Sequence, residues 1–314
     1  MASESENLAG RTIAGYRLLE RVGEGGTATV YRAEHPQRGP AAVKVLKERL
    51  RHDATAVKRF LREAGYGTRV VHPYVVRTYD YGEEDALHYL ALEWAGGEPL
   101  SEFLDRCGPL APALVSQIVS QLAEALAVAH QAGIIHRDLK PENIMYDAAT
   151  QQAKLLDFGI ARDAQADAAE RLTRAGFFVG TLQYVAPEAL SGELVREPAD
   201  IYSLANITYH LLTGKHPYRG RTQRELFQQL LKAAPAPMND DGSPVTIPPN
   251  VERVIMTGLS RNPADRQPSV KAFAQELAAV VVAGAQAPEK PARSSLSSFR
   301  AFLGRLSWSH KDEE

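Results

Sequence analysis

Two carboxylates and one amide near the middle of the chain have the chemistry needed to bind a metal ion. Asp138 follows the apolar pair Ile134-Ile135, Asn143 lies five residues further on, and Asp157 comes after another short apolar run. Oxygen atoms of this kind are the ligands that hard cations such as Mg²⁺ prefer. The three residues therefore predict a magnesium site, provided that the fold brings them to one edge.

The segment between Asn143 and Asp157 predicts how that happens. Residues 144–146 are apolar, residues 147–152 form a polar turn, and residues 155–156 are apolar again. This pattern favours two short antiparallel strands joined by a turn, which return the chain to its starting edge. We therefore expect Asp157 to emerge beside Asn143 and Asp138.

Residues 135–143 read Ile-His-Arg-Asp-Leu-Lys-Pro-Glu-Asn, and Asp-Phe-Gly follows at residues 157–159. This segment resembles the catalytic loop and the metal-binding triplet of the eukaryotic-like protein kinases. Lys140 is similar to its counterpart in serine/threonine kinases. The likeness is greatest to the bacterial serine/threonine kinases and covers residues 16–277. The alternative is a polar hairpin of another fold in which all these specified positions agree by chance.

The resemblance implies an α+β, bilobal protein kinase fold, in which ATP and Mg²⁺ bind between the lobes. A small lobe would hold an antiparallel β-sheet with one helix, and a larger lobe would be mainly helical. Asp138 would orient the substrate hydroxyl and accept its proton, while Asn143 and Asp157 would hold the metal. Lys140 would stabilise the charge on the γ-phosphoryl group, and Thr181 would contact Asp138 and Lys140.

A glycine-rich turn, residues 23–28, lies between two stretches that suit strands. Glycine lets backbone N–H groups approach phosphate oxygens without intervening side chains. A dinucleotide-binding fingerprint would open a helix here, but residues 30–33 continue as a strand, and the Gly-Lys-Ser/Thr of a P-loop is absent. A nucleotide lid and a plain hairpin both fit the turn itself. The resemblance favours the lid, with Ala28 in place of the third glycine of kinases.

Lys44 lies in the apolar stretch 41–46, which we expect to be a strand. It is either a charge that protects a sheet edge or, as the resemblance implies, the lysine that binds the α- and β-phosphates. Its partner in the second case would be Glu63, within a helix expected over residues 55–68. Gly67 stands where kinases usually have an apolar residue of the core that links the lobes. We therefore expect this helix to move easily.

The strand expected over residues 87–94 leads into Glu93-Trp94-Ala95-Gly96-Gly97, which resembles the hinge that binds the adenine edge. The residues that the resemblance assigns to the nucleotide are Val22, Gly23, Glu24, Gly25, Gly26, Val30, Ala42, Lys44, Leu92, Glu93, Ala95, Met145 and Asp157.

Beyond the hinge the apolar spacing becomes helical over residues 114–133, with a buried face. A second apolar helix, residues 200–214, is expected to begin at Asp200. That residue is expected to hold the backbone of the catalytic loop; the alternative is a simple N-cap, and the two roles are compatible. Further helices are expected over residues 225–231, 250–258 and 270–282. The expected division is a flexible N-terminus (1–15), a small lobe (16–94), a large lobe (95–284) and a tail (285–314).

Residues 157–188 form one long loop, of a length that is uncommon inside a compact domain unless it is functional. It resembles a kinase activation segment, and its final Ala186-Pro187-Glu188 implies a protein substrate. Phosphorylation of Thr173 would let the phosphate pair with Arg137 and order the loop; the alternative is a solvated threonine. Arg266 is expected to pair with Glu188.

Composition excludes several classes of protein. The chain has 314 residues, a net charge of −2 and 24% charged residues, so no bulk basic field favours nucleic acid. Its single cysteine, Cys107, excludes an intramolecular disulfide and is typical of a reducing compartment. No apolar run approaches the ~20 residues that span a bilayer. The first ten residues are too polar for a secretory signal. The sequence therefore predicts a cytoplasmic protein.

The tail and the rival functions leave alternatives open. Residues 293–308 could form a helix that contacts a membrane surface or a partner protein, or the whole tail could be disordered or weakly docked. Pairing of small lobes in a homodimer occurs in the family. The rival functions are a non-catalytic scaffold that binds nucleotide and a phosphotransferase acting on small molecules. The expected partners are otherwise protein substrates with Ser/Thr acceptors.

Overall fold

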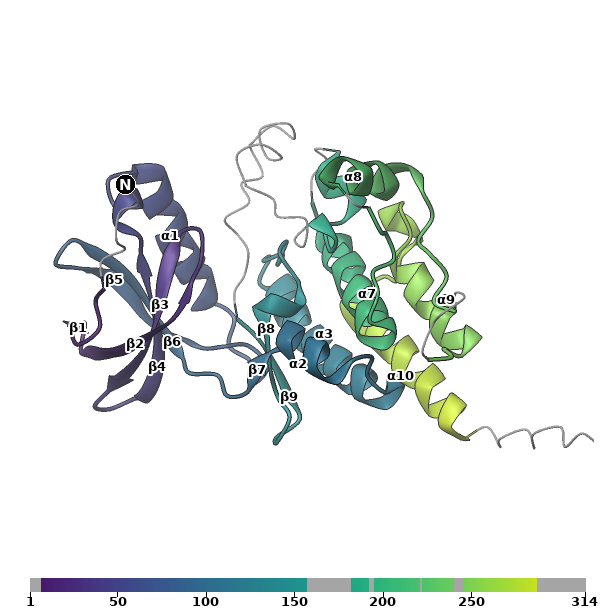
Figure 1. Cartoon of the computed structure of the whole chain (residues 1–314), viewed down its shortest axis with the longest axis horizontal. Coiled ribbons are helices and arrows are strands. Elements are labelled where there is room, and N and C mark those ends of the chain that lie inside the picture. Colours follow the sequence, from purple (N-terminus) through teal and green to yellow (C-terminus); the bar gives the residue numbers. More distant parts are fainter. Residues whose placement is uncertain (1–6, 157–181, 192–194, 221, 240–244, 287–314) are drawn as a thin grey trace, which may run out of the picture.

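A six-stranded antiparallel sheet forms the small lobe. The computed structural model describes residues 7–156, 182–191, 195–220, 222–239 and 245–286. The strand order in the sheet is β1-β2-β3-β4-β6-β5, and helix α1 lies across one face (Figure 1). The elements are β1 (Thr12–Ile13), β2 (Tyr16–Glu24), β3 (Ala28–His35), β4 (Gly39–Leu46), α1 (Ala54–Gly67), β5 (Thr78–Glu84) and β6 (Leu87–Glu93).

Strand β4 shows how the sequence assigns the two faces of this sheet. Ala41, Val43 and Val45 are buried in one cluster with Leu8, Ile13 and Tyr16 of the N-terminal segment. Successive side chains of a strand point to opposite faces. Ala42, Lys44 and Leu46 therefore belong to the other face, where Ala42 and Leu46 pack with residues of α1.

Helix α1 begins with a strong cap and ends against β5. The Asp53 side chain accepts hydrogen bonds from Thr55 N and Ala56 N, at 2.9 and 3.2 Å, which satisfies two free donors of the first turn. At the other end, a side chain at Gly67 would overlap the Thr78 hydroxyl. The close approach of α1 to β5 therefore explains why position 67 is a glycine. Whether α1 moves easily stays a prediction.

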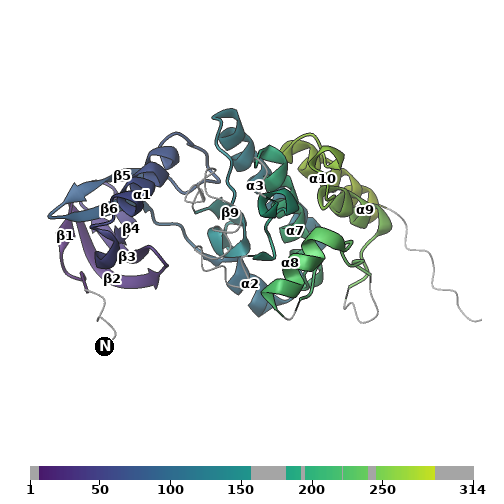
Figure 2. The same ribbon diagram turned by 90° about the horizontal axis from the view of Figure 1, so that it is seen from above.

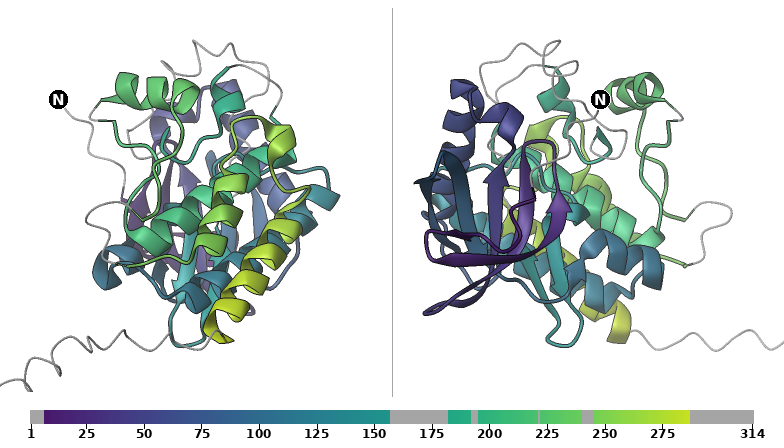
Figure 3. Two further views of the ribbon diagram at one scale, coloured as in Figure 1. Left: turned by 90° about the vertical axis from the view of Figure 1, so that its right-hand side faces the viewer. Right: turned by 60° about the vertical axis from the view of Figure 1, so that its left-hand side comes forward.

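The large lobe is a set of helices around α3 and α7, both of which bury most of their length (Figures 2 and 3). Helix α10 packs against α3, α7 and α9, and α9 packs against α7. The helices are α2 (Leu100–Cys107), α3 (Pro112–Gln131), α6 (Pro187–Leu190), α7 (Glu197–Thr213), α8 (Gln223–Lys232), α9 (Pro249–Gly258) and α10 (Val270–Gln286). Three 3₁₀ turns are η1 (Glu48–Leu50), η2 (Pro141–Asn143) and η3 (Pro263–Asp265).

A three-stranded sheet lies between the small lobe and the helices of the large lobe (Figure 1). It consists of β7 (Glu98–Pro99), β8 (Ile144–Asp147) and β9 (Gln152–Leu155). Strands β8 and β9 pair antiparallel, with Ile144 opposite Leu155. The hairpin predicted between Asn143 and Asp157 is therefore confirmed up to Leu156, and so is the bilobal α+β fold.

Gly97 connects the lobes in a conformation that only glycine adopts easily. Its φ is +83°, and a Cβ atom there would overlap the backbone of Tyr146. We expect Gly97→Ala to lower the free energy of unfolding by about 2 kcal/mol or more, because the new methyl group adds both backbone strain and overlap. Urea unfolding measures this loss.

Gly26→Ala is the matched control, because a Cβ atom at Gly26 would meet no heavy atom within 4 Å. Equal stability losses in the two variants would contradict the strain assigned to Gly97.

Several expected elements differ from the structure. The two valines at positions 75 and 76 favour a strand, but they form only an isolated bridge between Val75 and Leu155, and the strand of this region is β5. Helix α2 was not expected. Helix α7 begins at Glu197, so Asp200 lies inside its first turn, and the predicted N-cap role for Asp200 is wrong. Helix α10 extends to Gln286, two residues into the predicted tail, and the rest of the tail, Thr173 and Thr181 lie outside the described residues.

Within the described part of the chain, one helix has the length and hydropathy of a membrane span. It is α3, and 61% of its apolar window is buried inside the large lobe. A count of uninterrupted apolar residues does not detect α3, because polar residues interrupt its apolar stretch. The core helix of a globular protein can have the same length and hydropathy, and the apolar residues of α3 belong to the main hydrophobic core.

Candidate active site

The backbone around Asp138 forms a tight turn held by a buried acid. Arg137 has a φ of +63°, which ordinary residues rarely adopt, and Asp138 N donates to His136 O at 2.9 Å. Asp200 accepts hydrogen bonds from the backbone N–H groups of His136 and Arg137, at 2.9 and 3.0 Å. The prediction that Asp200 holds the catalytic-loop backbone is confirmed.

Asp200 is fully buried and remains a carboxylate because of its partners. Burial alone would raise its pKa. The hydrogen bond from His130 at 2.8 Å, the charges of His130 and His136, and the His136 N–H together outweigh burial and hold the pKa below its ordinary value of 3.8. An ionised acid therefore fixes the turn. His130 was missed from sequence, because nothing local links it to Asp200 across 70 positions.

Asn143 and Lys140 both contact Asp138. The side-chain amide of Asn143, from η2, donates to Asp138 O at 2.8 Å and to its Oδ2 at 3.1 Å. Lys140 Nζ lies 3.4 Å from the same Oδ2, and about a fifth of each of the Lys140 and Asp138 side chains is exposed. The structure thus brings three of the predicted catalytic residues together, with Asp138 accessible enough to meet a substrate.

The hairpin of β8 and β9 returns the chain to this turn. Leu156 N donates to Asn143 O at 3.0 Å, and Ile144 pairs with Leu155. Leu156 is the last described residue before Asp157. Asp157 and Thr181 themselves lie outside the described residues.

The donor set around Asn143 fits a hard cation. Because the amide nitrogen of Asn143 donates to Asp138, its amide oxygen is the atom left to coordinate a metal. The described residues hold no group of three or more His, Cys, Asp and Glu suited to a metal. The metal pair of Asn143 and Asp157 stays a prediction.

Lys44 lies on the sheet face that α1 covers. In the registers of the sheet, Lys44 pairs with Val30 on one side and with Leu90 on the other, while Ala42 pairs with Leu92. Leu90 and Leu92 pack with Phe60 and Ala64 of α1, and Ala95 joins the same cluster. The structure thus places Val30, Ala42, Lys44, Leu92 and Ala95 on or beside one surface.

Glu63 lies one turn from Phe60 and next to Ala64, both of which face the sheet from α1. Lys44 and Glu63 therefore come from facing elements. The ion pair between them stays a prediction.

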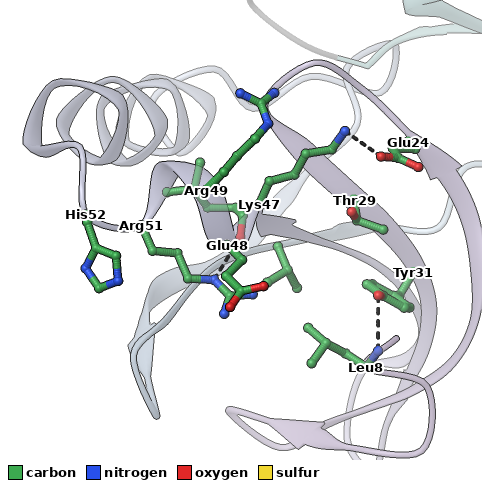
Figure 4. Close-up of a pocket in the computed structure, with 11 residues that line it drawn as sticks. Leu8, Glu24, Thr29, Tyr31, Lys47, Glu48, Arg49, Arg51 and His52 are labelled. Carbon is green, nitrogen blue, oxygen red and sulfur yellow. Dashed lines mark hydrogen bonds and ion pairs between the residues drawn. The ribbon is translucent and has the colours of Figure 1, made fainter. Parts of the chain in front are cut away.

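The glycine-rich turn is a hairpin tied to the segment that precedes α1 (Figure 4). Lys47 Nζ lies 2.5 Å from Glu24 Oε1, Lys47 N donates to Thr27 O at 2.9 Å, and Arg49 donates to Gly26 O. The hydrogen bond from Lys47 lowers the pKa of Glu24, aided by the charges of Arg21 and Arg49. Sequence reasoning missed these anchors, which join the lid to the start of α1.

A cavity of about 470 Å³ lies beside these anchors (Figure 4). Leu8, Tyr31 and Val45 line it, together with the Lys47–His52 segment. Of the described residues assigned to the nucleotide, Glu24 alone lines this cavity, so the cavity overlaps the predicted nucleotide site at one residue.

The other described residues assigned to the nucleotide lie on β2, on the turn after it, at the end of β6 and on β8. Glu93, at the end of β6, is fixed by an ion pair with Lys154 and by a hydrogen bond from Arg77 N at 3.2 Å. Val22 is half-exposed on β2, and Met145 is partly exposed on β8. Gly23 lies at the end of β2, and Gly25 N closes the turn on Ala28 O at 2.9 Å.

A protein kinase domain model matches residues 16–277, which is most of the chain. The chain belongs to the protein kinase family. The motif that carried the expectation, residues 135–143, lies within the matched part.

Similar proteins include serine/threonine kinases of bacteria. The chain is 39% identical to serine/threonine-protein kinase pkn3 of Myxococcus xanthus, in a match covering 94% of this chain and 55% of that protein. It is 37% identical to PknA of Mycobacterium tuberculosis, covering 91% and 65%. It is 38% identical to PknD of the same organism, covering 84% and 39%. The chain thus spans between about two fifths and two thirds of these relatives.

Solved structures show the same fold. The kinase domain of Mycobacterium tuberculosis PknI matches with a TM-score of 0.64 and 29% identity, covering 86% of this chain and 96% of that one. Rad53 in complex with AMP-PNP matches with a TM-score of 0.67 and 26% identity, covering 83% and 64%.

A buried ion pair fixes the end of the activation segment in this kinase domain. Arg266 donates to the two carboxylate oxygens of Glu188 at 2.7 and 2.8 Å, and its guanidinium lies over the Tyr202 ring. Arg266 also donates to Pro198 O at 2.8 Å, which ties α6 to α7. The predicted pairing of Arg266 with Glu188 is confirmed, in the two-pronged geometry that suits a buried pair.

Two partly buried histidines of the large lobe predict a pH dependence of stability. Burial lowers the pKa of His210 to about 4. Burial, helped by the charges of His210 and Arg219, lowers that of His216 to about 3. Their ordinary value is 6.5, so below it the unfolded chain binds more protons than the folded one. Each histidine should therefore remove up to about 1.4 kcal/mol of stability per pH unit as the pH falls from 6.5 towards 4.

Urea unfolding at pH 7.5, 6.0 and 5.0 measures this slope. His216→Phe should reduce the slope of unfolding free energy against pH by the contribution of one histidine. His52→Phe, at an exposed position, should leave that slope unchanged. An unchanged slope in His216→Phe would contradict the claim that the fold keeps His216 in its neutral form.

Proposed function

We propose that this chain is a serine/threonine protein kinase that transfers the γ-phosphoryl group of ATP to hydroxyl groups of protein substrates. The observation that carries this proposal is the joint contact of Lys140 and Asn143 with Asp138, in a turn that buried Asp200 holds. This arrangement supports a role for Asp138 at the reacting centre.

Phosphoryl transfer needs positioned charges more than covalent chemistry, and this site can supply them. Asp138 orients the acceptor hydroxyl and takes its proton as the bond to phosphorus forms. Lys140 lies close enough to Asp138 to meet the phosphoryl oxygens that carry the developing charge. Asp138 itself is held by the amide nitrogen of Asn143, so its carboxylate cannot turn away.

Asn143 and Asp157 would hold Mg²⁺, which neutralises phosphate charge when bound. Support for Asp157 comes from its neighbour Leu156, whose N–H donates to Asn143 O. The lid residues Gly23 to Gly26 would offer backbone N–H groups to the phosphates, and the surface around Ala42, Leu92 and Ala95 would receive the adenine ring.

Lys44 would bind the α- and β-phosphates, with Glu63 as its partner. We expect Lys44→Met to lower kcat/KM for ATP by about 10²-fold or more, because a charge-assisted contact to phosphate is lost from the ground state and the transition state alike. Steady-state kinetics with varied ATP measure the loss. Lys58→Met, which removes an exposed lysine from α1, is the matched control, and equal losses in both variants would refute the role of Lys44.

Activation would involve the segment between Asp157 and Glu188. Phosphorylation of Thr173 would place a doubly charged group within reach of Arg137, and Thr181 would help present the substrate. The fixed end of the segment at the Glu188–Arg266 pair supports this proposal, because a loop anchored at its end can switch as one unit.

Radiolabelled ATP, Mg²⁺ and a generic protein substrate test the proposed function. Label on Ser or Thr of the substrate is the expected result. Label on a small molecule would indicate the other phosphotransferase class, and no label would indicate a non-catalytic scaffold. A phosphosite map of the chain after incubation with ATP alone tests Thr173 in the same preparation.

A further inference from the structure

Two basic side chains hold the glycine-rich lid to the segment that precedes α1. Lys47 Nζ lies 2.5 Å from Glu24 Oε1, and Arg49 donates a hydrogen bond to Gly26 O. The backbone N–H of Lys47 adds a third contact, because it donates to Thr27 O at 2.9 Å. Figure 4 shows both side chains extending to the same side of this segment, with Lys47 directed at Glu24. Three positions of the lid are therefore attached to one short piece of chain.

This supporting segment, residues 47–53, has a fixed backbone. Leu50 N donates to Lys47 O at 2.8 Å, and Asp53 N donates to Leu50 O at 3.1 Å. Asp53 then caps α1, and Val57 N of that helix donates to Asp53 O at 2.9 Å. Hydrogen bonds therefore connect the lid contacts with the first turn of α1 without interruption. The lid is held against a rigid element rather than against a free loop.

The Glu24 carboxylate is engaged by cations of the chain itself. Arg21, on β2, contacts it as well as Lys47. The hydrogen bond from Lys47 is the main cause of the lowered pKa of Glu24, so this carboxylate is ionised at neutral pH. The side chains of Lys47 and Glu24 are 19% and 33% exposed, so water screens the pair only in part. Glu24 would therefore meet a nucleotide through its backbone, while its side chain attaches the lid to Lys47.

The turn itself does not need these contacts to close. Gly25 N donates to Ala28 O at 2.9 Å, and β2 pairs with β3 as far as Glu24 and Thr29. Partly exposed ion pairs also contribute little to the stability of a fold. A glycine-rich turn, however, has access to many backbone conformations, and only some of them present their N–H groups to phosphate oxygens. Contacts that select one conformation before the nucleotide arrives reduce the entropy lost on binding.

We infer that Lys47 and Arg49 are positioning residues that hold the lid in the conformation that binds ATP. This inference rests on the proposed function, of which it needs only the nucleotide site. The two residues act through the Glu24 carboxylate and the Gly26 carbonyl, and not by contact with ATP. An ordered lid favours the bound ground state and the transition state alike, so its loss should raise KM for ATP and leave kcat near its wild-type value.

Titration of the full chain with ATP and Mg²⁺ tests the role of Lys47. We expect Lys47→Met to raise the dissociation constant of ATP by about fivefold, the factor that one partly exposed ion pair supplies. Lys47→Arg should bind ATP nearly as wild type does, because a guanidinium group can also pair with Glu24. Lys58→Met makes the same chemical change at an exposed position of α1 and should leave ATP binding unchanged. In steady-state kinetics, KM for ATP should rise with the dissociation constant, while KM for the protein substrate should not.

Arg49→Met should weaken ATP binding by a similar factor, because the carbonyl of Gly26 loses its charged donor. Arg17→Met, at an exposed position of β2, is the matched control and should bind ATP as wild type does. Equal dissociation constants in Arg49→Met and Arg17→Met would remove Arg49 from the inference.

A double-mutant cycle with Glu24→Gln separates a positioning role from direct attraction of ATP by the charge of Lys47. If Lys47 acts through Glu24, Lys47→Met should add no further loss once Glu24→Gln has removed the carboxylate. An equal loss in both backgrounds would overturn the inference, because the charge would then act on ATP itself. Wild-type binding by Lys47→Met, or a failure of Lys47→Arg to retain binding, would overturn it as well.

Hydrogen exchange and ATP binding separate this inference from the proposed function. Without nucleotide, the amides of residues 25–28 should exchange faster in Lys47→Met than in wild type, and those of α9 should not. Unchanged exchange at residues 25–28 would overturn the inference even in an active kinase. A wild-type chain that binds ATP and transfers no label would overturn the proposed function and leave the role of Lys47 and Arg49 standing. A wild-type chain that binds no ATP would overturn both.

Discussion

Replacing Asp138 by Asn should lower kcat by about 10³-fold, the usual worth of a positioned general base, and leave the fold intact. The Asn143 amide and Lys140 Nζ both approach Asp138 Oδ2, at 3.1 and 3.4 Å. An amide at position 138 can still be oriented by its neighbours, but it cannot take a proton from a hydroxyl group. The side chain is partly exposed, so its charge contributes little to stability. Thermal unfolding and ATP binding should therefore remain near wild type.

Asp147→Asn is the matched control for this variant. It makes the same chemical change at the far end of β8, where the Asp147 side chain accepts from Ala149 N at 2.9 Å. Steady-state phosphorylation of a protein substrate measures both. If Asp138→Asn keeps activity within a factor of about ten of wild type, Asp138 is not the base.

Replacing Asp200 by Asn should cost about 3–5 kcal/mol of unfolding free energy and most of the activity. The carboxylate accepts from His130, from His136 N and from Arg137 N, and it is fully buried. An amide offers one acceptor oxygen and turns an NH₂ group towards these donors. The turn at Arg137, with its positive φ, then loses hydrogen bonds that stabilise it, and Asp138 is no longer held in position.

Urea unfolding and kinetics measure the two effects of Asp200→Asn. Thr208→Val is a suitable comparison, because Thr208 is a buried residue of the same helix whose hydroxyl donates to Leu204 O of that helix, at 2.7 Å. The sign of the pH dependence is fixed by the lowered pKa of Asp200. Its contribution is complete above its unfolded value of 3.8 and is lost as the pH falls through the folded value. Wild-type stability in Asp200→Asn would show that the carboxylate is no structural anchor.

The sequence predicted those parts of the site whose signals are contiguous. Residues 135–143 and the hairpin that follows are local patterns, so the turn and the return of the chain to Asn143 could be foreseen. The contact of Lys140 with Asp138 came from the structure. The pairing of Arg266 with Glu188 came from the family resemblance. Lys44–Glu63 and the ligands beyond Leu156 stay predictions.

Other features could not be predicted because their partners are far apart in sequence. His130 meets Asp200 across 70 positions, and Arg49 meets Gly26 across 23. Strand β5 is a polar edge strand without a clear alternation of apolar residues, so its pattern did not indicate a strand. Helix α2 did carry a signal, since Leu100, Phe103 and Leu104 have helical spacing and are buried, but it spans only eight residues.

The Mg²⁺ dependence of ATP binding in wild type and in Asp157→Ala tests most directly whether Asp138, Asn143 and Asp157 surround one cation. Isothermal titration of the full chain with ATP, with and without Mg²⁺, gives both dissociation constants. We predict that Mg²⁺ tightens binding to wild type and not to Asp157→Ala, at equal thermal stability. Equal tightening by Mg²⁺ in both proteins would contradict a metal site at this edge.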